Sequence, residues 1–198
     1  MTSGSKIRLE RWGRGLLAVL AFSASSAWAL DLPELMGLLA KQKSGEARFT
    51  EQRFVRGLEG PLDASGTLSF QAPDRLTRRT LTPRPETMAV DGNTLTLSRG
   101  GRTRTMTLDS MPELLGMVEA MRGTLNGNTQ SLARYFRTSV SGTPDKWTLD
   151  LVPIDEKLAA QVRTLRLSGR AGEVLGIEME FIGGDRSVMS ITPTRTAP

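Results

Sequence analysis

Short segments in which apolar and polar residues alternate, each ended by a turn sequence, constrain the fold of this 198-residue chain most strongly. Residues 64–71 alternate small or apolar with polar side chains at every step, which is typical of a strand with one buried face. The segments that follow are separated by Thr82-Pro83, Asp91-Gly92 and Gly100-Gly101, which are common turn sequences. The pattern predicts an antiparallel meander with strands at residues 64–71, 76–81, 86–90, 94–98 and 102–108.

The same alternation returns at Trp147 and continues towards the end of the chain. It predicts strands at residues 147–151, 162–168, 174–182 and 187–191, in addition to a strand that starts near Glu46. The total is about ten strands, and an open sheet of that size tends to curl. No long-period repeat or linker divides the sequence, so we expect one mainly β domain over residues 30–198.

Three segments have helical periodicity instead. The first follows Asp31, a good N-cap residue, with Pro33 in the first turn, and Gly45 ends it. The second is expected to start at a capping box formed by Ser110 and Glu113, and it carries an apolar stripe at helical spacing. A short third helix is expected at residues 130–136. These helices are available to cover one side of the curled sheet.

The first 29 residues have the three parts of a secretory signal peptide. Basic residues precede the apolar run 16–22, and Ala27-Trp28-Ala29 forms an A-x-A cleavage site. The uncharged stretch 15–30 is shorter than the ~20 apolar residues that a membrane span needs. We therefore expect cleavage after Ala29 and export of a soluble protein. Loss of this segment lowers the net charge from +5 to +2, so the basic composition does not indicate nucleic-acid binding.

The composition excludes several kinds of catalytic site. The chain has no Cys and no His, so it cannot form disulfides, thiolate nucleophiles, Ser-His-Asp triads or HExxH zinc sites. No G-x-x-x-x-G-K sequence is present, and no pair of carboxylates has a spacing that suggests glycosidase chemistry. We expect a binding protein without a cofactor or a metal rather than an enzyme.

A curled sheet with one apolar face must cover that face, and the residue pattern leaves two ways to do so. The face can be filled by its own side chains, which is the commoner solution because protein interiors pack without large voids. It can also be closed by helices around a cavity. The eight Met residues after residue 30 fit a packed core and an adaptable ligand surface equally well. The pattern by itself does not choose between these two.

Three motifs in the first half of the domain resemble LolA, the family of periplasmic carriers of outer-membrane lipoproteins in Gram-negative bacteria. They are a Phe-x-x-Gln strand at Phe49, a G-x-L-x-F strand at residues 66–70 that leads to the turn at Pro73, and an Asp-Gly hairpin at Asp91. Residues 132–136, the strand 147–153 and the final hairpin are also similar, so the resemblance covers residues 32–191. It implies an incomplete antiparallel barrel closed by a helical lid around an apolar cavity for acyl chains.

The resemblance also implies a function and a set of binding residues. The protein is expected to act in the periplasm as a monomer, to carry lipid or lipoprotein acyl chains from the inner towards the outer membrane, and to exchange them with an inner-membrane releasing transporter and an outer-membrane acceptor. The residues expected to line the lipid site are Leu35, Leu38, Leu39, Leu68, Phe70, Met88, Val90, Leu95, Leu97, Met106, Leu114, Leu115, Val118 and Met121.

Three departures from the family pattern leave the cargo open. The Arg that ties the lid shut in LolA is replaced by Ala72, with Arg75, Arg78 and Arg79 as nearby substitutes. The expected cavity is mainly aliphatic and Met rather than aromatic, and the chain ends soon after Ile191. The alternatives are a carrier of a different lipid or lipid-linked product, or a periplasmic lipid-sensing regulatory domain.

Basic residues gather around the first hairpins. One interpretation is an ordinary solvated outer face of the strands. The other is docking to an acidic partner or to anionic headgroups through Arg75, Arg78 and Arg79.

Overall fold

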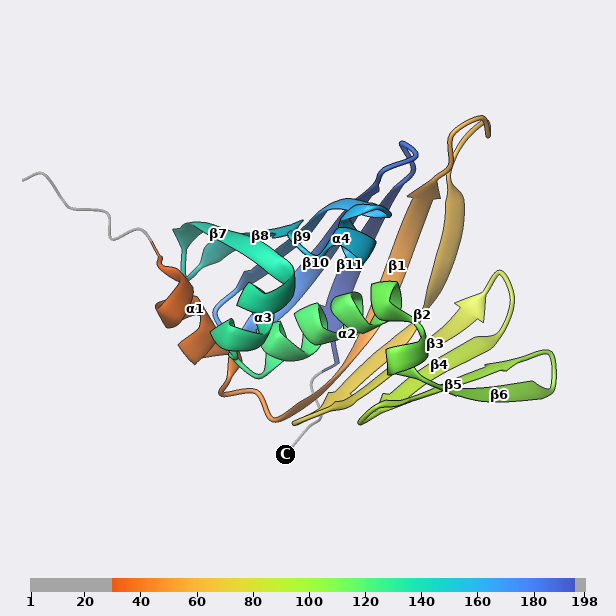
Figure 1. The fold of residues 1–198 in the computed structure, drawn as a ribbon, viewed down its shortest axis with the longest axis horizontal. Helices are drawn as coiled ribbons and strands as arrows, with labels where there is room; N and C mark the ends of the chain where they lie inside the picture. Colours follow the sequence, from red (N-terminus) through yellow and green to blue (C-terminus); the bar gives the residue numbers. More distant parts are fainter. Residues whose placement is uncertain (1–29, 195–198) are drawn as a thin grey trace, which may run out of the picture.

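The computed structural model describes residues 30–194, and its central feature is a single antiparallel sheet of eleven strands. The sheet curves strongly around its helices (Figure 1). The strand order is β6-β5-β4-β3-β2-β1-β11-β10-β9-β8-β7, so the last strand pairs with the first and the edges are β6 and β7. The strands are β1 (Ser44–Phe54), β2 (Leu62–Gln71), β3 (Arg75–Thr82), β4 (Glu86–Asp91), β5 (Thr94–Arg99), β6 (Arg102–Thr107), β7 (Phe136–Thr143), β8 (Lys146–Pro153), β9 (Val162–Arg170), β10 (Glu173–Phe181) and β11 (Arg186–Pro193).

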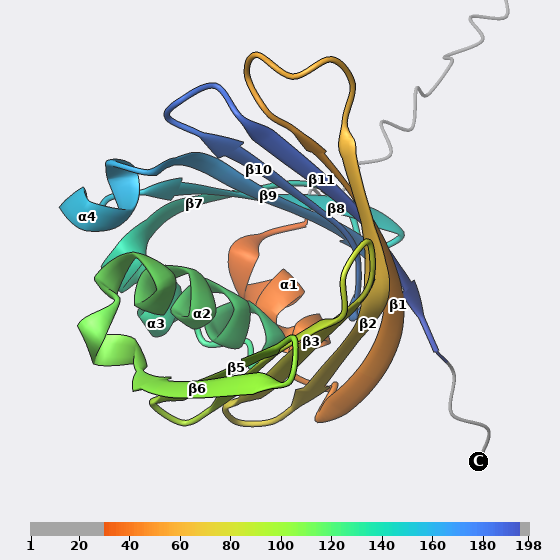
Figure 2. The same cartoon turned by 90° about the vertical axis from the view of Figure 1, so that its right-hand side faces the viewer.

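The helices lie on the concave side and over the seam that separates the two edge strands (Figure 2). They are α1 (Leu32–Leu39), the 3-10 helix η1 (Leu108–Ser110), α2 (Pro112–Leu125), α3 (Thr129–Tyr135) and α4 (Glu156–Ala159). The long helix α2 enters directly from β6 through η1, and α3 leads into β7. The predicted fold, a curved antiparallel sheet that does not close and carries helices over its open side, is confirmed.

Because every strand runs antiparallel to its neighbours, the connections alternate between the two ends of the sheet. One end, which we call the rim, carries the connections β1–β2, β3–β4, β5–β6, β8–β9 and β10–β11. The opposite end, the far end, carries the turns β2–β3, β4–β5, β7–β8 and β9–β10. Helix α1 lies at the far end, and Figure 2 looks towards the rim.

Two separate groups of buried apolar side chains lie under the helices. The larger group joins α1 and α3 to the strands β7–β9, and it includes the fully buried Trp147, Leu149 and Leu167. The smaller group joins α2 and η1 to β4 and β5 through Val90, Leu95, Leu108 and Val118. The sheet therefore has one half with a large packed core and one half with a small one.

Two predictions about local structure are wrong. The sequence analysis missed strand β7, whose residues 137–143 are mostly polar or small, so the alternation that marks the other strands is absent there. The capping box at the start of α2 does not form. The N-cap is Met111, and the hydroxyl of Ser110 instead donates to the carbonyl of Thr107, because residues 108–110 form the 3-10 helix.

The predicted start of the first helix is confirmed. The carboxylate of Asp31 accepts a hydrogen bond from the backbone N–H of Glu34 at 2.8 Å. The helix ends at Leu39, earlier than Gly45, because Ser44 already belongs to β1. Residues 1–29, where the signal peptide is predicted, lie outside the described part of the chain.

Candidate functional site

The concave face of β2–β6 is built from cross-strand rows of side chains. Partners in an antiparallel register point to the same side of the sheet, so one row can be followed across several strands. The row nearest the far end is entirely apolar and consists of Phe70, Leu76, Val90, Leu95 and Met106. The buried members Val90 and Leu95 pack with Val118 of α2, which shows that this row faces the helix.

The next two rows become progressively more polar towards the rim. The middle row contains three apolar and two basic side chains: Leu68, Arg78, Met88, Leu97 and Arg104. The row closest to the rim is polar: Gly66, Thr80, Glu86, Arg99 and Arg102. The concave wall thus has a gradient, apolar beneath α2 and charged where it approaches the rim.

Part of the apolar wall is only partly buried. Leu68, Phe70 and Leu97 are neither fully buried nor members of the two groups of packed side chains within residues 30–194. They lie on the concave face, next to partly buried Leu76 and Met88. We call Leu68, Phe70 and Leu97 the apolar floor. A concave apolar surface that is only partly buried is suited to apolar ligands.

A polar cluster lies where the floor approaches the rim. Glu51 on β1 accepts hydrogen bonds from Arg78 on β3 and from Ser187 on β11, although its side chain is only 13% exposed. The guanidinium of Arg78 also stacks on Phe49, 4.8 Å from the ring centre. Glu51 and Arg78 border an open hollow of about 300 Å³ that is also lined by Thr80, Glu86 and Met88. The hollow is therefore lined by both polar and apolar side chains.

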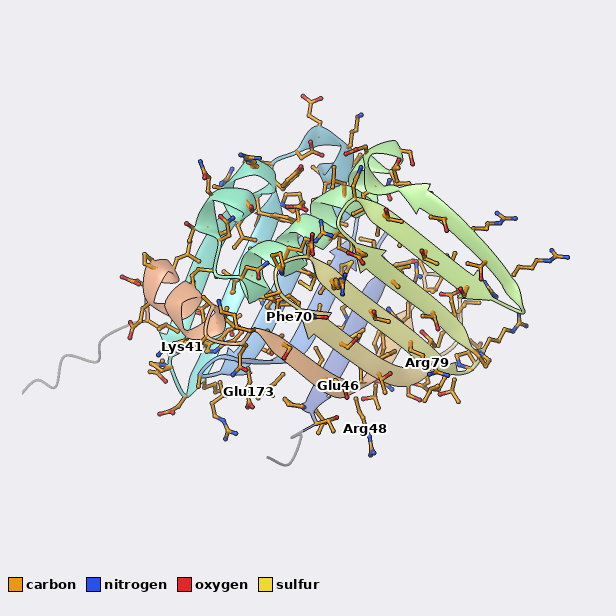
Figure 3. All side chains as sticks on the ribbon, turned by 90° about the horizontal axis from the view of Figure 1, so that it is seen from below. Lys41, Glu46, Arg48, Phe70, Arg79 and Glu173 are labelled. Carbon is orange, nitrogen blue, oxygen red and sulfur yellow. The ribbon has the colours of Figure 1, made fainter. Side chains whose placement is uncertain are left out.

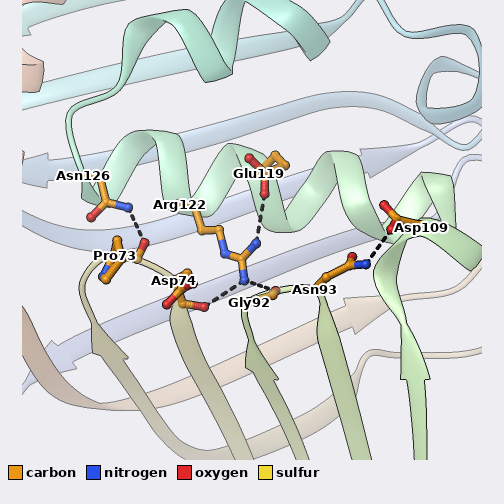
Figure 4. A network of polar contacts seen from close by, with 8 residues as sticks. All are labelled: Pro73, Asp74, Gly92, Asn93, Asp109, Glu119, Arg122 and Asn126. Atoms are coloured by element: carbon orange, nitrogen blue, oxygen red, sulfur yellow. Dashed lines mark hydrogen bonds and ion pairs between the residues drawn. The ribbon is translucent and has the colours of Figure 1, made fainter.

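Helix α2 is tied to the far end of the sheet by Arg122 (Figure 4). One guanidinium nitrogen donates to the backbone carbonyls of Asp74, at 2.8 Å, and Gly92. The other nitrogen bonds Glu119 at 3.0 Å, and the side chain is only 12% exposed. The two carbonyls belong to the β2–β3 and β4–β5 turns, so a single side chain fixes the helix to two hairpins. Hydrogen bonds from a charged donor are stronger than those between neutral groups.

Asn126, just after α2, adds a bond from its side-chain amide to the carbonyl of Pro73. We call Arg122 and Asn126 the latch. The family resemblance pointed to arginines on the strands as substitutes for the lid-closing Arg, so neither Arg122 nor Asn126 was predicted. Arg122 did carry a signal, since it follows Val118 by four residues and is a cation on the apolar stripe of α2.

The residues predicted to line the lipid site divide between the two packed groups and the floor. Leu35 and Leu39 on α1 are completely buried in the larger group, and Leu38 and Met121 pack against it. Leu114, Leu115 and Met106 pack against the smaller group, together with Met88. The structure therefore brings Leu114, Leu115 and Val118 of α2 together with the predicted residues of β2–β6, and it places Met121 and the predicted residues of α1 in a separate core.

The three arginines predicted to dock a partner do not share a surface. Arg78 is on the concave face, whereas Arg75 and Arg79 alternate with it and point outward. Figure 3 shows Arg79 on the outer face with Glu46 and Arg48. Arg75 is exposed and pairs with Asp91 at 3.2 Å. A similar outer pair joins Arg166 to Asp150, and this carboxylate raises the pKa of the Arg166 guanidinium. Exposed pairs of this type contribute little to stability.

Between residues 30 and 194 no group of three acidic side chains is placed to hold a metal ion. None of the helices in that range is long and apolar enough to cross a membrane.

The fold and the helix-covered concave face together define a lid-bearing incomplete barrel. A family model described as "Outer membrane lipoprotein carrier protein LolA-like" matches residues 24–194. Because this match covers most of the chain, the protein belongs to the LolA-like family, and the resemblance inferred from the sequence motifs is confirmed.

Several solved structures are similar to the chain. A LolA superfamily protein from Nitrosomonas europaea is 12% identical, with 86% of this chain and 96% of that chain covered and a TM-score of 0.48. MucB from Pseudomonas aeruginosa, solved in complex with MucA, is 14% identical, with coverages of 85% and 59% and a TM-score of 0.44. The lipoprotein LppX from Mycobacterium tuberculosis is 9% identical, with coverages of 84% and 98% and a TM-score of 0.41. A search of curated proteins found no match.

Proposed function

We propose that the protein is a periplasmic carrier that holds acyl chains between the apolar floor and helix α2 and shuttles them from the inner towards the outer membrane. The observation that carries this proposal is the floor itself: Leu68, Phe70 and Leu97 are apolar, lie on the concave face and are only partly buried. Transfer of an acyl chain from water to such a surface is favourable by about 0.8 kcal/mol for each buried CH₂ group. Binding therefore requires no chemical step, and we propose no enzymatic activity.

The gradient along the concave wall orients the cargo in this proposal. Chain ends lie against the all-apolar row under α2, and the polar part of the molecule lies near Thr80, Glu86 and Arg99 at the rim side. The latch holds α2 over the chains. Release follows when a receptor offers a better site or when α2 swings away from the turns that Arg122 contacts.

The compartment and the partners belong to the same proposal. The signal peptide at residues 1–29 directs export, and the single domain that follows acts as a monomer in the periplasm. It receives cargo from an inner-membrane releasing transporter and delivers it to an outer-membrane acceptor. The arginine-containing middle row, with Arg78 and Arg104, favours a second candidate cargo, a lipid with an anionic polar group in place of a lipoprotein.

The proposal is tested by a matched pair of substitutions on one strand. Leu68→Asp places a carboxylate on the floor, whereas Thr67→Asp places one on the exposed outer face next to it. We expect Leu68→Asp to lower the affinity for a fluorescent fatty-acyl probe by roughly tenfold or more, because the floor can no longer be covered by an alkyl chain. Thr67→Asp should bind like the parent protein. Circular dichroism and thermal unfolding monitor folding of both variants.

Equal probe affinity in the two folded variants would contradict an acyl site on the floor. Mass spectrometry of lipid extracted from the native protein then identifies the cargo, and it separates a lipoprotein carrier from a carrier of another lipid. A carrier releases its ligand when acceptor membranes are added, whereas a lipid-sensing domain retains it.

A further inference from the structure

The large apolar side chains that remain exposed in the described residues all lie at one end of the molecule. Each is about half exposed or slightly less, from 39% for Val152 to 54% for Leu58. They come from four different connections and the strand ends beside them. They are Leu58, Leu62, Leu81, Val152, Ile154 and Ile182.

The topology explains why these positions are neighbours although they are far apart in the sequence. Leu58 and Leu62 flank the β1–β2 connection, and Leu81 precedes the β3–β4 turn. Ile154 lies in the β8–β9 connection and Ile182 in the β10–β11 turn. All these connections are on the rim, which faces the viewer in Figure 2. The far-end turns contribute no side chain to this set within residues 30–194.

Contacts within this domain do not bury these apolar side chains. An isolated apolar side chain on a surface needs no explanation, but their concentration on one edge is the usual sign of an interaction surface. We call Leu58, Leu81, Ile154 and Ile182 the apolar rim, since they lie at or beside four separate loop tips. Figure 2 shows these connections at separate places along the curved end of the sheet.

Basic side chains accompany the rim on the β1–β6 half. The β1–β2 connection and its flanks contain Arg53 and Arg56, the β3–β4 turn contains Arg84, and the β5–β6 turn is bordered by Arg99 and Arg102. The same half of the rim carries three acidic residues, Glu59, Asp63 and Glu86. Glu86 lies 3.7 Å from Arg99, and Asp185 of the neighbouring β10–β11 turn lies 3.7 Å from Arg53. The half of the rim from β1 to β6 therefore has a small excess of positive charge.

We propose that the rim docks the protein onto the surface of a lipid bilayer that contains anionic headgroups. Separate apolar tips can each dip between headgroups, while the arginines beside them meet lipid phosphates at the same depth. A protein receptor would be better matched by one contiguous apolar patch with a polar border. Docking in this orientation places the open hollow beside Arg78 against the bilayer. The proposal does not depend on which cargo the floor holds.

The test is co-sedimentation of the purified full-length protein with lipid vesicles. Vesicles of phosphatidylcholine mixed with phosphatidylglycerol are compared with vesicles of phosphatidylcholine alone. We expect binding to the anionic vesicles, with a marked decrease as salt is added. Every variant keeps residues 1–29 of the parent, so any contribution of that segment is the same in all samples.

Two kinds of variant assign the binding to the rim. Leu58→Ser combined with Ile182→Ser removes two apolar tips, and we expect most of the vesicle binding to be lost. Arg84→Gln combined with Arg102→Gln should weaken binding by about fivefold for each charge removed. The matched control, Arg48→Gln combined with Arg170→Gln, removes two exposed charges from the outer face and the far end, and it should bind like the parent.

The proposal is overturned if the two arginine pairs lose affinity equally, since binding would then follow net charge and not position. It is also overturned if the parent protein does not bind anionic vesicles. If the serine variant nevertheless loses cargo transfer in cells, the rim recognises a protein receptor in place of a bilayer. These outcomes are independent of the acyl-probe test, because none of the substituted rim residues belongs to the floor.

Discussion

The two halves of the sheet cover their apolar concave faces in different ways. Both present an apolar concave face, and in both the register lines up apolar side chains across the strands. On β7–β10 the face is filled by Trp147, Leu149 and Leu167, together with α1 and α3. On β2–β6 it is covered by α2 but incompletely filled, which leaves the floor partly exposed. The filled half supports the fold, and in the proposed function the incompletely filled half receives the ligand.

The largest expected effect comes from the filled half. Leu149→Ala should lower the free energy of unfolding by about 3 to 5 kcal/mol, because Leu149 is completely buried and its removal leaves a cavity among rigid neighbours. Denaturant unfolding measures this effect. A loss below about 1 kcal/mol would show that this half is not the packed core, since large-to-small changes in well-packed sites cost more.

An intermediate effect on stability is expected at the latch, which joins α2 to the β2–β3 and β4–β5 turns. Arg122→Gln removes the bonds to the carbonyls of Asp74 and Gly92, and it should lower the free energy of unfolding by about 2 kcal/mol. Hydrogen exchange in α2 should become faster, and the acyl probe should dissociate faster. Arg134→Gln on the exposed surface of α3 is the control. If α2 exchanges at the same rate in both variants, Arg122 does not hold the helix.

The smallest effect on stability is expected on the floor. Leu97→Ala is the same substitution as at Leu149, but Leu97 is only partly buried, so the loss should be below about 1 kcal/mol. Leu97→Ala should lower the affinity for the acyl probe more than Leu149→Ala does. The order of the two variants is therefore expected to be the reverse of their order in stability. Parallel titrations of the two variants measure this. The same order in both measurements would remove the distinction between the halves.

The direction of a side chain on a strand can be predicted from the sequence. The period of two in the strand predicted at residues 76–81 places Arg78 opposite in direction to Arg79, and the observed strand β3 extends the alternation to Arg75. Proximity in the sequence therefore does not make the three arginines one docking surface. The structure separates them into a concave arginine and two outer ones.

Other features could not be predicted from local patterns. Strand β7 lacks alternation, and it is held in the sheet by pairing with β8 along its length. Arg122 acts on turns that precede it by 48 and 30 residues, so its role depends on where those hairpins end in space. The apolar rim likewise combines loops that only the order of eleven strands brings to one end.

Features that depend on a few neighbouring residues follow directly from the amino-acid sequence. These are the alternation of the strands, the turns at Asp91 and Gly100, and the cap at Asp31, because backbone preference and local hydrogen bonds decide them. The tertiary structure is needed to establish which half of the sheet is filled, what holds α2 and which loops form the rim. These depend on packing and pairing between residues far apart in the chain, where side-chain volumes and register must match across the whole sheet.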